Sequence, residues 1–238
     1  MKTKLFLPLI VAISMGLFFA CDTTDSDDTD DGNGGGAAET VNSISGTIED
    51  WDGSTDKTVE LVAVNYMTRE RMSIASAAIA ANGSFTLSSI PTPSADYLMK
   101  MDLTANLDSG CEGEFTLSDT TILFGMTELR TATDGELGGW ITAASNHPDS
   151  IDQEGDFEIS YQYSNKAGSA TGYILCDKSF GTYTKYEREE INISVSQGWN
   201  KIVMKLTSKN VNNTDITTIG GAVPDSPPLK FYYEANTP

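Results

Sequence analysis

The most regular spacing of oxygen ligands in this chain is an acidic run that begins at Asp50. Asp50, Asp52, Ser54 and Asp56 stand at alternate positions, as the ligands of a calcium-binding loop do. The run lacks the glycine at the sixth position and the glutamate at the twelfth that define an EF-hand. The alternative is a solvated loop in which Asp and Gly satisfy turn preferences. Calcium is the one cofactor that the sequence keeps as a candidate.

A second acidic group, further along the chain, has carboxylates that could also bind calcium. Its residues are Asp149, Asp152, Glu154 and Asp156.

His147 is the single histidine of the chain, and it decides what catalysis the sequence can support. Nucleophilic catalysis of the Ser-His-Asp or Cys-His kind needs a histidine beside its nucleophile. His147 lies in a short polar loop that has no nucleophile signature. Glycoside hydrolysis needs only two carboxylates, and with 34 acidic residues the chain has too many for their number to discriminate. We therefore expect no enzyme, and a small hydrolase is the last of three hypotheses.

Three tryptophans, Trp51, Trp140 and Trp199, stand at or beside predicted turns. An exposed indole can stack on the apolar face of a sugar ring, so each is a candidate for glycan binding. The alternative is that at least two of the tryptophans cap hydrophobic cores, because large aromatic side chains dominate core energetics.

Two cysteines, Cys111 and Cys176, lie in the part of the chain that is rich in predicted strands. In an exported protein such an even pair is a candidate disulfide, which here would close a loop of about 65 residues. The alternative is two buried free thiols. A zinc site is not expected, because the chain has one histidine and no C-x-x-C.

The net charge of −19 limits the partners of this protein. An acidic surface repels the phosphates of nucleic acids and anionic lipid headgroups, so neither is an expected partner.

The beginning of the chain predicts where the protein is located. Lys2 and Lys4 precede an apolar run over residues 5–20, which is the layout of a secretory signal peptide. This run is shorter than the roughly 20 residues that a membrane-spanning helix needs. Residues 21–40 are rich in Asp and Gly and read as a disordered linker.

The sequence Phe18-Phe19-Ala20-Cys21 resembles the lipobox of bacterial lipoproteins. The resemblance implies that Cys21 carries the lipid and attaches the protein to the membrane. The alternative is an ordinary signal peptide with an incidental cysteine. The aspartates after Cys21 resemble the surface-export signals of Bacteroidota lipoproteins, which implies the outer membrane and the cell surface rather than a periplasm-facing anchor.

From residue 41 onward the pattern is that of short strands separated by turn residues. We expect residues 157–163 to pair with 171–176, and residues 191–195 to form a hairpin with 202–206 across Gly198. The other strands are predicted at 44–48, 58–66, 72–80, 84–87, 96–103, 113–117, 121–131, 138–142 and 229–234.

Part of this pattern resembles the carboxypeptidase-regulatory-like, transthyretin-like β-sandwich. The resemblance lies in the strand at 44–48, the strand at 59–64 and the hairpin at Asn82-Gly83. In that family such modules are structural spacers or docking units. We therefore expect an all-β protein, with a transthyretin-like β-sandwich over residues 41–103 and a second antiparallel β-sandwich-like domain over 104–238.

These observations predict a non-enzymatic, lipid-anchored envelope protein with a structural or partner-docking role, whose partner is another envelope protein. The second hypothesis is a surface lipoprotein that binds polysaccharide.

Overall fold

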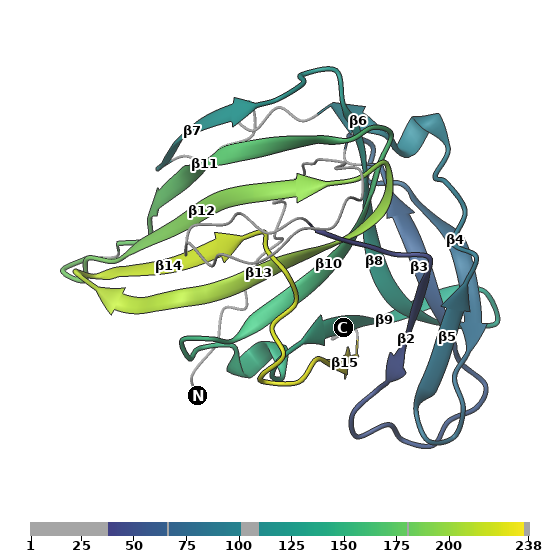
Figure 1. Ribbon diagram of the computed structural model, residues 1–238. Coiled ribbons are helices and arrows are strands. Elements are labelled where there is room, and N and C mark those ends of the chain that lie inside the picture. The colour runs from purple at the N-terminus through teal and green to yellow at the C-terminus, as the bar shows by residue number, and fades with distance from the viewer. Residues whose placement is uncertain (1–37, 66, 101–109, 180, 236–238) are drawn as a thin grey trace, which may run out of the picture.

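The computed structural model describes residues 38–65, 67–100, 110–179 and 181–235, and within them the protein is all-β (Figure 1). The two helices in these ranges are single 3-10 turns, at Ala95–Tyr97 and Pro148–Ser150. No helix there has the length and apolar character that crossing a bilayer requires. The strands are β1 (Glu39–Thr40), β2 (Ser43–Thr47), β3 (Thr58–Val64), β4 (Arg71–Ala78), β5 (Ser84–Ser88), β6 (Met99–Lys100), β7 (Cys111–Leu117), β8 (Leu123–Thr133), β9 (Glu136–Ala144), β10 (Phe157–Ser164), β11 (Gly168–Asp177), β12 (Tyr186–Val195), β13 (Gly198–Val211), β14 (Thr214–Ile219) and β15 (Lys230–Glu234).

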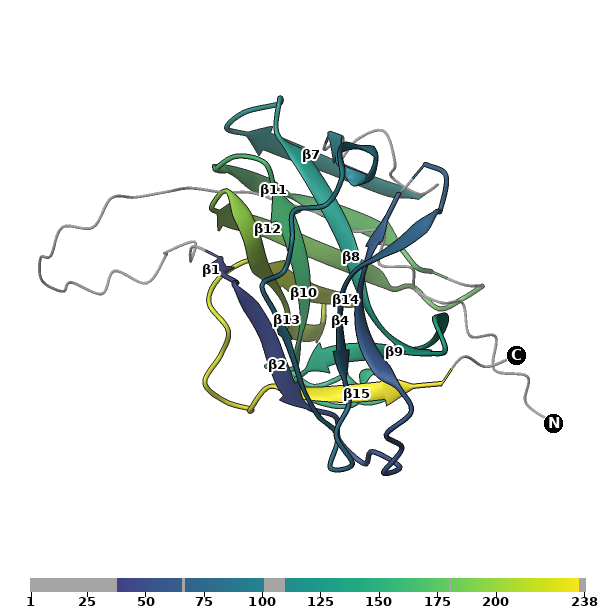
Figure 2. The ribbon, with the colours of Figure 1, turned by 90° about the vertical axis from the view of Figure 1, so that its right-hand side faces the viewer.

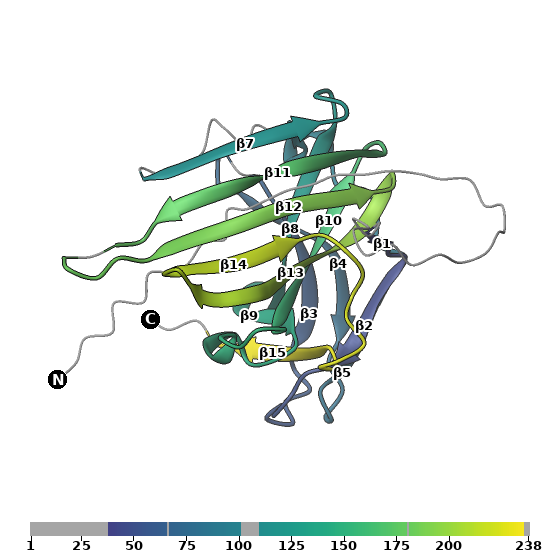
Figure 3. The same ribbon diagram turned by 60° about the vertical axis from the view of Figure 1, so that its left-hand side comes forward.

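Most of these strands belong to one 13-stranded sheet. Its main path runs β4-β3-β8-β9-β10-β13-β14-β12-β11-β7, while β1 pairs with β13, β15 with β9, and β6 with β8. The sheet is mixed, because β12 and β14 run parallel whereas the other pairs are antiparallel. Figure 3 shows β7, β11, β12, β14 and β13 following one another as a single layer.

The second layer is a ribbon of β2 and β5 that lies at the β3–β4 end of the large sheet (Figures 1 and 2). Between the layers lies the first hydrophobic core, to which β10 contributes Phe157, Ile159, Tyr161 and Tyr163. These residues alternate along the strand, so they share one face of the sheet.

The end of the chain completes this first core. Phe231 of β15 lies under β2, where a Cβ on Gly46 would come within 2.2 Å of its ring. Ile48 forms a parallel bridge with Phe231, and Lys230 forms an ion pair with Glu49 at 2.7 Å. The C-terminal strand is thereby fastened to the segment that follows β2.

The opposite face of the large sheet carries a second core. Ile191 and Ile193 of β12, Ile174 of β11 and Ile202 of β13 are buried in it. Ile202 and Val203 are neighbours in β13, but they belong to different cores. β13 is therefore buried on both faces, which makes it the central strand of the protein.

The predicted strands largely coincide with observed ones, but three predicted pairings are wrong. β10 pairs with β8, β9 and β13 rather than with β11. β14 lies between β12 and β13, so these two strands do not form a hairpin. The turn at Asn82 and Gly83 exists, yet it joins β4 in one sheet to β5 in the other.

The large sheet crosses the predicted boundary after residue 103, because β3 pairs with β8 from Thr58–Ala132 to Val64–Met126. The transthyretin-like arrangement and the division into two domains therefore stay predictions. Residues 39–40, which the sequence placed in the linker, form β1 on β13 instead. The predicted signal peptide, Cys21 and the linker up to residue 37 lie outside the described residues.

Candidate ligand-binding face around Trp140

The face of the sheet that points away from β2 and β5 carries a row of polar side chains across several strands. Glu60 of β3 is the register partner of Arg130 of β8, and Arg130 is the partner of Trp140 of β9. Glu234 of β15 continues the row as the partner of Trp140. Directly opposed residues of an antiparallel pair share a face and lie close together. The chain thus brings an acid, a base and an indole side by side.

A two-residue hairpin sets the register of β8 and β9. Asp134 and Gly135 link the strands with positive φ angles of 51° and 85°. An Asp-Gly pair favours this type I′ geometry, because aspartate tolerates the left-handed region and glycine enters it freely.

A β-bulge between β8 and β9 sets the orientation of the Arg130 side chain. The register of the two strands shifts after Arg130, where Gly138 and Gly139 occupy β9. A Cβ on Gly139 would lie 2.2 Å from the carbonyl oxygen of Glu234, so only glycine fits there. The carbonyl of Gly138 accepts hydrogen bonds from Nε of Arg130 at 3.1 Å and from its Nη2. Bulges re-aim side chains in this way.

Glu128 ties two arginines together. Its Oε2 accepts from Nε of Arg71 at 2.9 Å and from Nη1 of Arg130 at 3.2 Å. Its Oε1 accepts from Nη2 of Arg71 at 2.9 Å, which completes a bidentate pair. The hydrogen bonds to Glu128 raise the pKa of Arg71, so this guanidinium stays charged.

Glu60 is held by hydroxyl groups. Its carboxylate accepts from Thr58 at 2.6 Å, from Ser76 at 2.7 Å and from Ser73. It is only 8% exposed, although it lies on the face away from β2 and β5. We call Glu60, Arg71, Glu128, Arg130 and Trp140 the Trp140 face.

Trp140 covers the arginine beside it. The guanidinium carbon of Arg130 lies 4.1 Å from the ring centre of Trp140, and that of Arg71 lies 5.9 Å away. Arg130 is 6% exposed, whereas Trp140 keeps 39% exposure. Both guanidinium groups therefore lie over the ring of Trp140, which nevertheless remains partly exposed.

The other two tryptophans that were candidates for glycan binding serve the first core. Trp199 is 6% exposed and donates its Nε1 hydrogen to the carbonyl of Pro91 at 3.1 Å. Trp51 is half-buried, donates to the carbonyl of Ser54 at 2.9 Å, and meets Tyr233 edge-on at 5.7 Å between ring centres. Of the three, only Trp140 presents a large ring surface to solvent.

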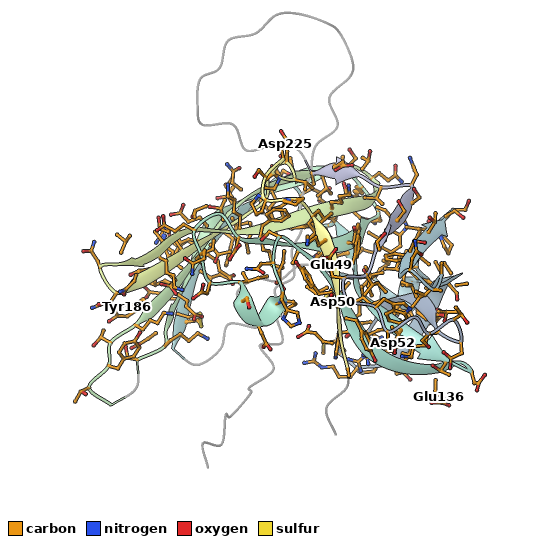
Figure 4. All side chains as sticks on the ribbon, turned by 90° about the horizontal axis from the view of Figure 1, so that it is seen from below. Glu49, Asp50, Asp52, Glu136, Tyr186 and Asp225 are labelled. Atoms are coloured by element: carbon orange, nitrogen blue, oxygen red, sulfur yellow. A yellow bond between two sulfur atoms is a disulfide. The ribbon has the colours of Figure 1, made fainter. Side chains whose placement is uncertain are left out.

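The acidic run that begins at Asp50 uses its oxygens within the loop. Oδ1 of Asp52 accepts from the backbone N–H of Ser54 at 2.8 Å, and Asp56 accepts from the Ser54 hydroxyl, which lowers the pKa of Asp56. Figure 4 labels Asp50 and Asp52 of this loop among the side chains of the protein. Throughout the described ranges, no group of three or more His, Cys, Asp or Glu side chains is arranged to hold a metal ion.

The second acidic group and His147 have structural contacts. Asp156 accepts from the backbone N–H groups of Asp152 and Gln153 at 3.1 and 3.0 Å. Nδ1 of His147 accepts from the backbone N–H of Asp149 at 3.3 Å, and its ring meets Tyr232 edge-on. In these contacts His147 acts as the cap of a short 3-10 turn.

Cys111 and Cys176 form a disulfide between register partners in β7 and β11. It ties the strand at the end of the sheet path to its neighbour, beside the second core.

Sequence reasoning identified Trp140 but missed the four charged residues of the Trp140 face. A signal for two of them was present, because Glu128 and Arg130 stand two residues apart in a predicted strand and must share a face. Glu60 and Arg71 carried no such signal, since only the pairing of β3 with β4 and β8 brings them near. No protein-family model, curated protein or solved structure matched this chain.

Proposed function

We propose that this protein is a non-enzymatic lipoprotein of the bacterial outer membrane, which presents its β-sheet body at the cell surface to dock another envelope protein. The observation that supports a tethered body is the way in which residues 38–40 are held. Ala38 is buried and donates its N–H to the carbonyl of Ser194 at 2.5 Å. β1 then pairs with β13, and Glu39 binds Lys201 at 2.8 Å. Residues 38–40 are therefore fixed to β12 and to the central strand β13.

Replacement of the lipidated cysteine tests this proposal. Cells that express the wild-type chain should retain the protein in the outer-membrane fraction, because two or three acyl chains hold a protein on a membrane essentially permanently. The Cys21→Ala variant should lose the lipid, which is measured by incorporation of an alkyne-labelled fatty acid, and should leave the membrane fraction. Digestion of intact cells with an added protease reports surface exposure.

Two results would contradict the anchor. An equal distribution of the wild-type chain and Cys21→Ala between fractions would show that Cys21 does not attach the protein. Label incorporation into Cys21→Ala would place the lipid elsewhere. The Ser26→Ala variant is a matched control, because it alters the same acidic segment and leaves Cys21 in place.

A second function, polysaccharide binding at the surface, is favoured by one observation. Trp140 keeps 39% exposure on a sheet face where its neighbour Arg130 keeps 6%. Exposing a large ring at such a position forgoes the stabilisation that burying it would bring. A role in ligand binding accounts for the arrangement.

A further inference from the structure

We infer that the Trp140 face binds a neutral pyranose unit of a polysaccharide, with the indole of Trp140 as the stacking surface. The inference rests on the second function proposed above and adds to it the site and the class of sugar. It follows from three properties of the face, namely a supported ring, fixed polar groups at its border and the absence of a net positive local charge.

The ring is supported before any ligand arrives. Arg130 lies 4.1 Å from the ring centre, and its own guanidinium is fixed by the carbonyl of Gly138 and by Glu128. A cation over one face of an indole is an attractive contact. A ligand that stacks on the exposed part of Trp140 therefore does not have to order the side chain first, which lowers the cost of binding.

The polar groups near the ring match the hydroxyls of a sugar. Sugar hydroxyls donate and accept hydrogen bonds, so their site needs both carboxylates and N–H groups. Beside Trp140, the sheet offers the partly exposed guanidinium of Arg71 and the carboxylate of Glu234, the register partner of Trp140. Each is already held by a partner within the sheet, and a rigid sheet keeps such groups in position better than a loop does.

The charge of the face selects a neutral ligand. Glu60 and Glu128 balance the two arginines, Glu234 adds a negative charge beside Trp140, and the whole chain carries −19. An acidic polysaccharide would gain no net local attraction and would be repelled by the rest of the surface. A second protein is a poorer fit, because stable protein interfaces bury about 800 Å² on each partner around an apolar centre. The Trp140 face has one exposed large apolar side chain.

Affinity electrophoresis and calorimetry test the inference on the mature chain with Cys21→Ser, which keeps every described residue. The probes are laminarin and glucomannan as neutral polysaccharides, and alginate and polygalacturonate as acidic ones. We expect a neutral probe to retard the protein and the acidic probes to leave it unretarded. Trp140→Ala should weaken binding by about tenfold or more, which corresponds to about 1.4 kcal/mol. Trp140→Phe should recover part of the affinity.

The matched control is Tyr183→Ala, which removes another exposed aromatic ring outside the Trp140 face and should leave affinity unchanged. Melting temperatures of all variants confirm that they fold. Retention of full affinity by Trp140→Ala would overturn the site while leaving polysaccharide binding intact. Tighter binding of an acidic probe would overturn the class of sugar. Absence of binding to every probe would overturn both the inference and the second function, and would not bear on the lipid anchor.

Discussion

At the scale of single residues, Glu189 of β12 combines burial with charge. Its Oε2 is the one buried side-chain oxygen or nitrogen without a hydrogen-bond partner in the part of the chain that the structure describes. It shares a sheet face with Ile191 and lies opposite Ile174 of β11. Burial, and then the charge of Glu187, raise the pKa of Glu189 to about 7, and Lys178 offsets this in part.

The raised pKa of Glu189 predicts that the protein loses stability as pH rises from about 5 to about 8. Between the unfolded pKa of 4.5 and the folded value of about 7, the folded state holds a proton that the unfolded chain has released. The free energy of unfolding should therefore fall with pH in this window, by up to about 3 kcal/mol. Urea unfolding of the wild-type chain and Glu189→Gln at pH 5 and pH 8 measures the effect.

The variant should be close to wild type at pH 5 and more stable than wild type at pH 8. Glu190→Gln is the matched control, since Glu190 is exposed on the opposite face and its substitution should leave the pH dependence unchanged. Parallel pH profiles for Glu189→Gln and the wild type would show that Glu189 is not a buried acid.

At the scale of elements, the bulge in β9 predicts the effect of adding one methyl group. A Cβ on Gly139 would meet the Glu234 carbonyl at 2.2 Å and the Tyr233 ring at 2.6 Å. Gly139→Ala should therefore push β15 away from β9 and lower the free energy of unfolding by about 2 kcal/mol. Chemical denaturation measures the loss. Gly135→Asn is the control, because nothing lies within 4 Å of that position and asparagine tolerates its positive φ. A similar loss in both variants would contradict the steric explanation.

The disulfide between β7 and β11 predicts a second effect at this scale. Removing a crosslink with a sequence separation of 65 residues frees the unfolded chain, and Cys111→Ser with Cys176→Ser should cost roughly 4 kcal/mol in the chain-entropy model. Urea unfolding with and without a reducing agent measures it. The reductant should destabilise the wild-type chain and leave the double variant unchanged. An equal response of both proteins would mean that the crosslink does not form in solution.

The strands could be predicted from the sequence, but their partners could not. Alternation along 157–163 and 191–195 identified β10 and β12, because each strand buries one face in a core. The predicted hairpin of β12 and β13 failed because β14 inserts between them, about twenty residues later in the chain. Local pattern shows that a segment is a strand, whereas its neighbour is decided by packing between distant segments.

The candidate site depended on the same distant pairing. Trp140 was one of three candidates for glycan stacking, and the alternative that at least two tryptophans cap cores describes Trp51 and Trp199. Those two rings reach the first core through contacts with Tyr233 and Tyr163, which lie far from them in the sequence. A sequence pattern reports that a tryptophan is near a turn. It does not show which aromatic side chains will pack against that tryptophan in the folded protein.

At the scale of the whole molecule, the large sheet predicts cooperative unfolding. β3 lies before the predicted boundary at residue 103 and β8 after it, yet they pair along seven residues and share the first core through Leu61 and Leu129. Scanning calorimetry should therefore give one transition, with equal calorimetric and van't Hoff enthalpies. Two resolved transitions would restore the division into two domains.

The fastening of β15 to the segment after β2 has a consequence for how the protein is made. Synthesis delivers a chain from its N-terminus, yet β1 can pair with β13, and Ile48 with Phe231, only after more than 150 further residues have been made. Loops of that length close slowly, because their entropy is lost before distant contacts form. The body therefore completes its fold only after nearly the whole chain has been delivered. A chain cut before Lys230 should leave Gly46 and the first core uncovered, and therefore more easily cleaved by proteases than the intact chain.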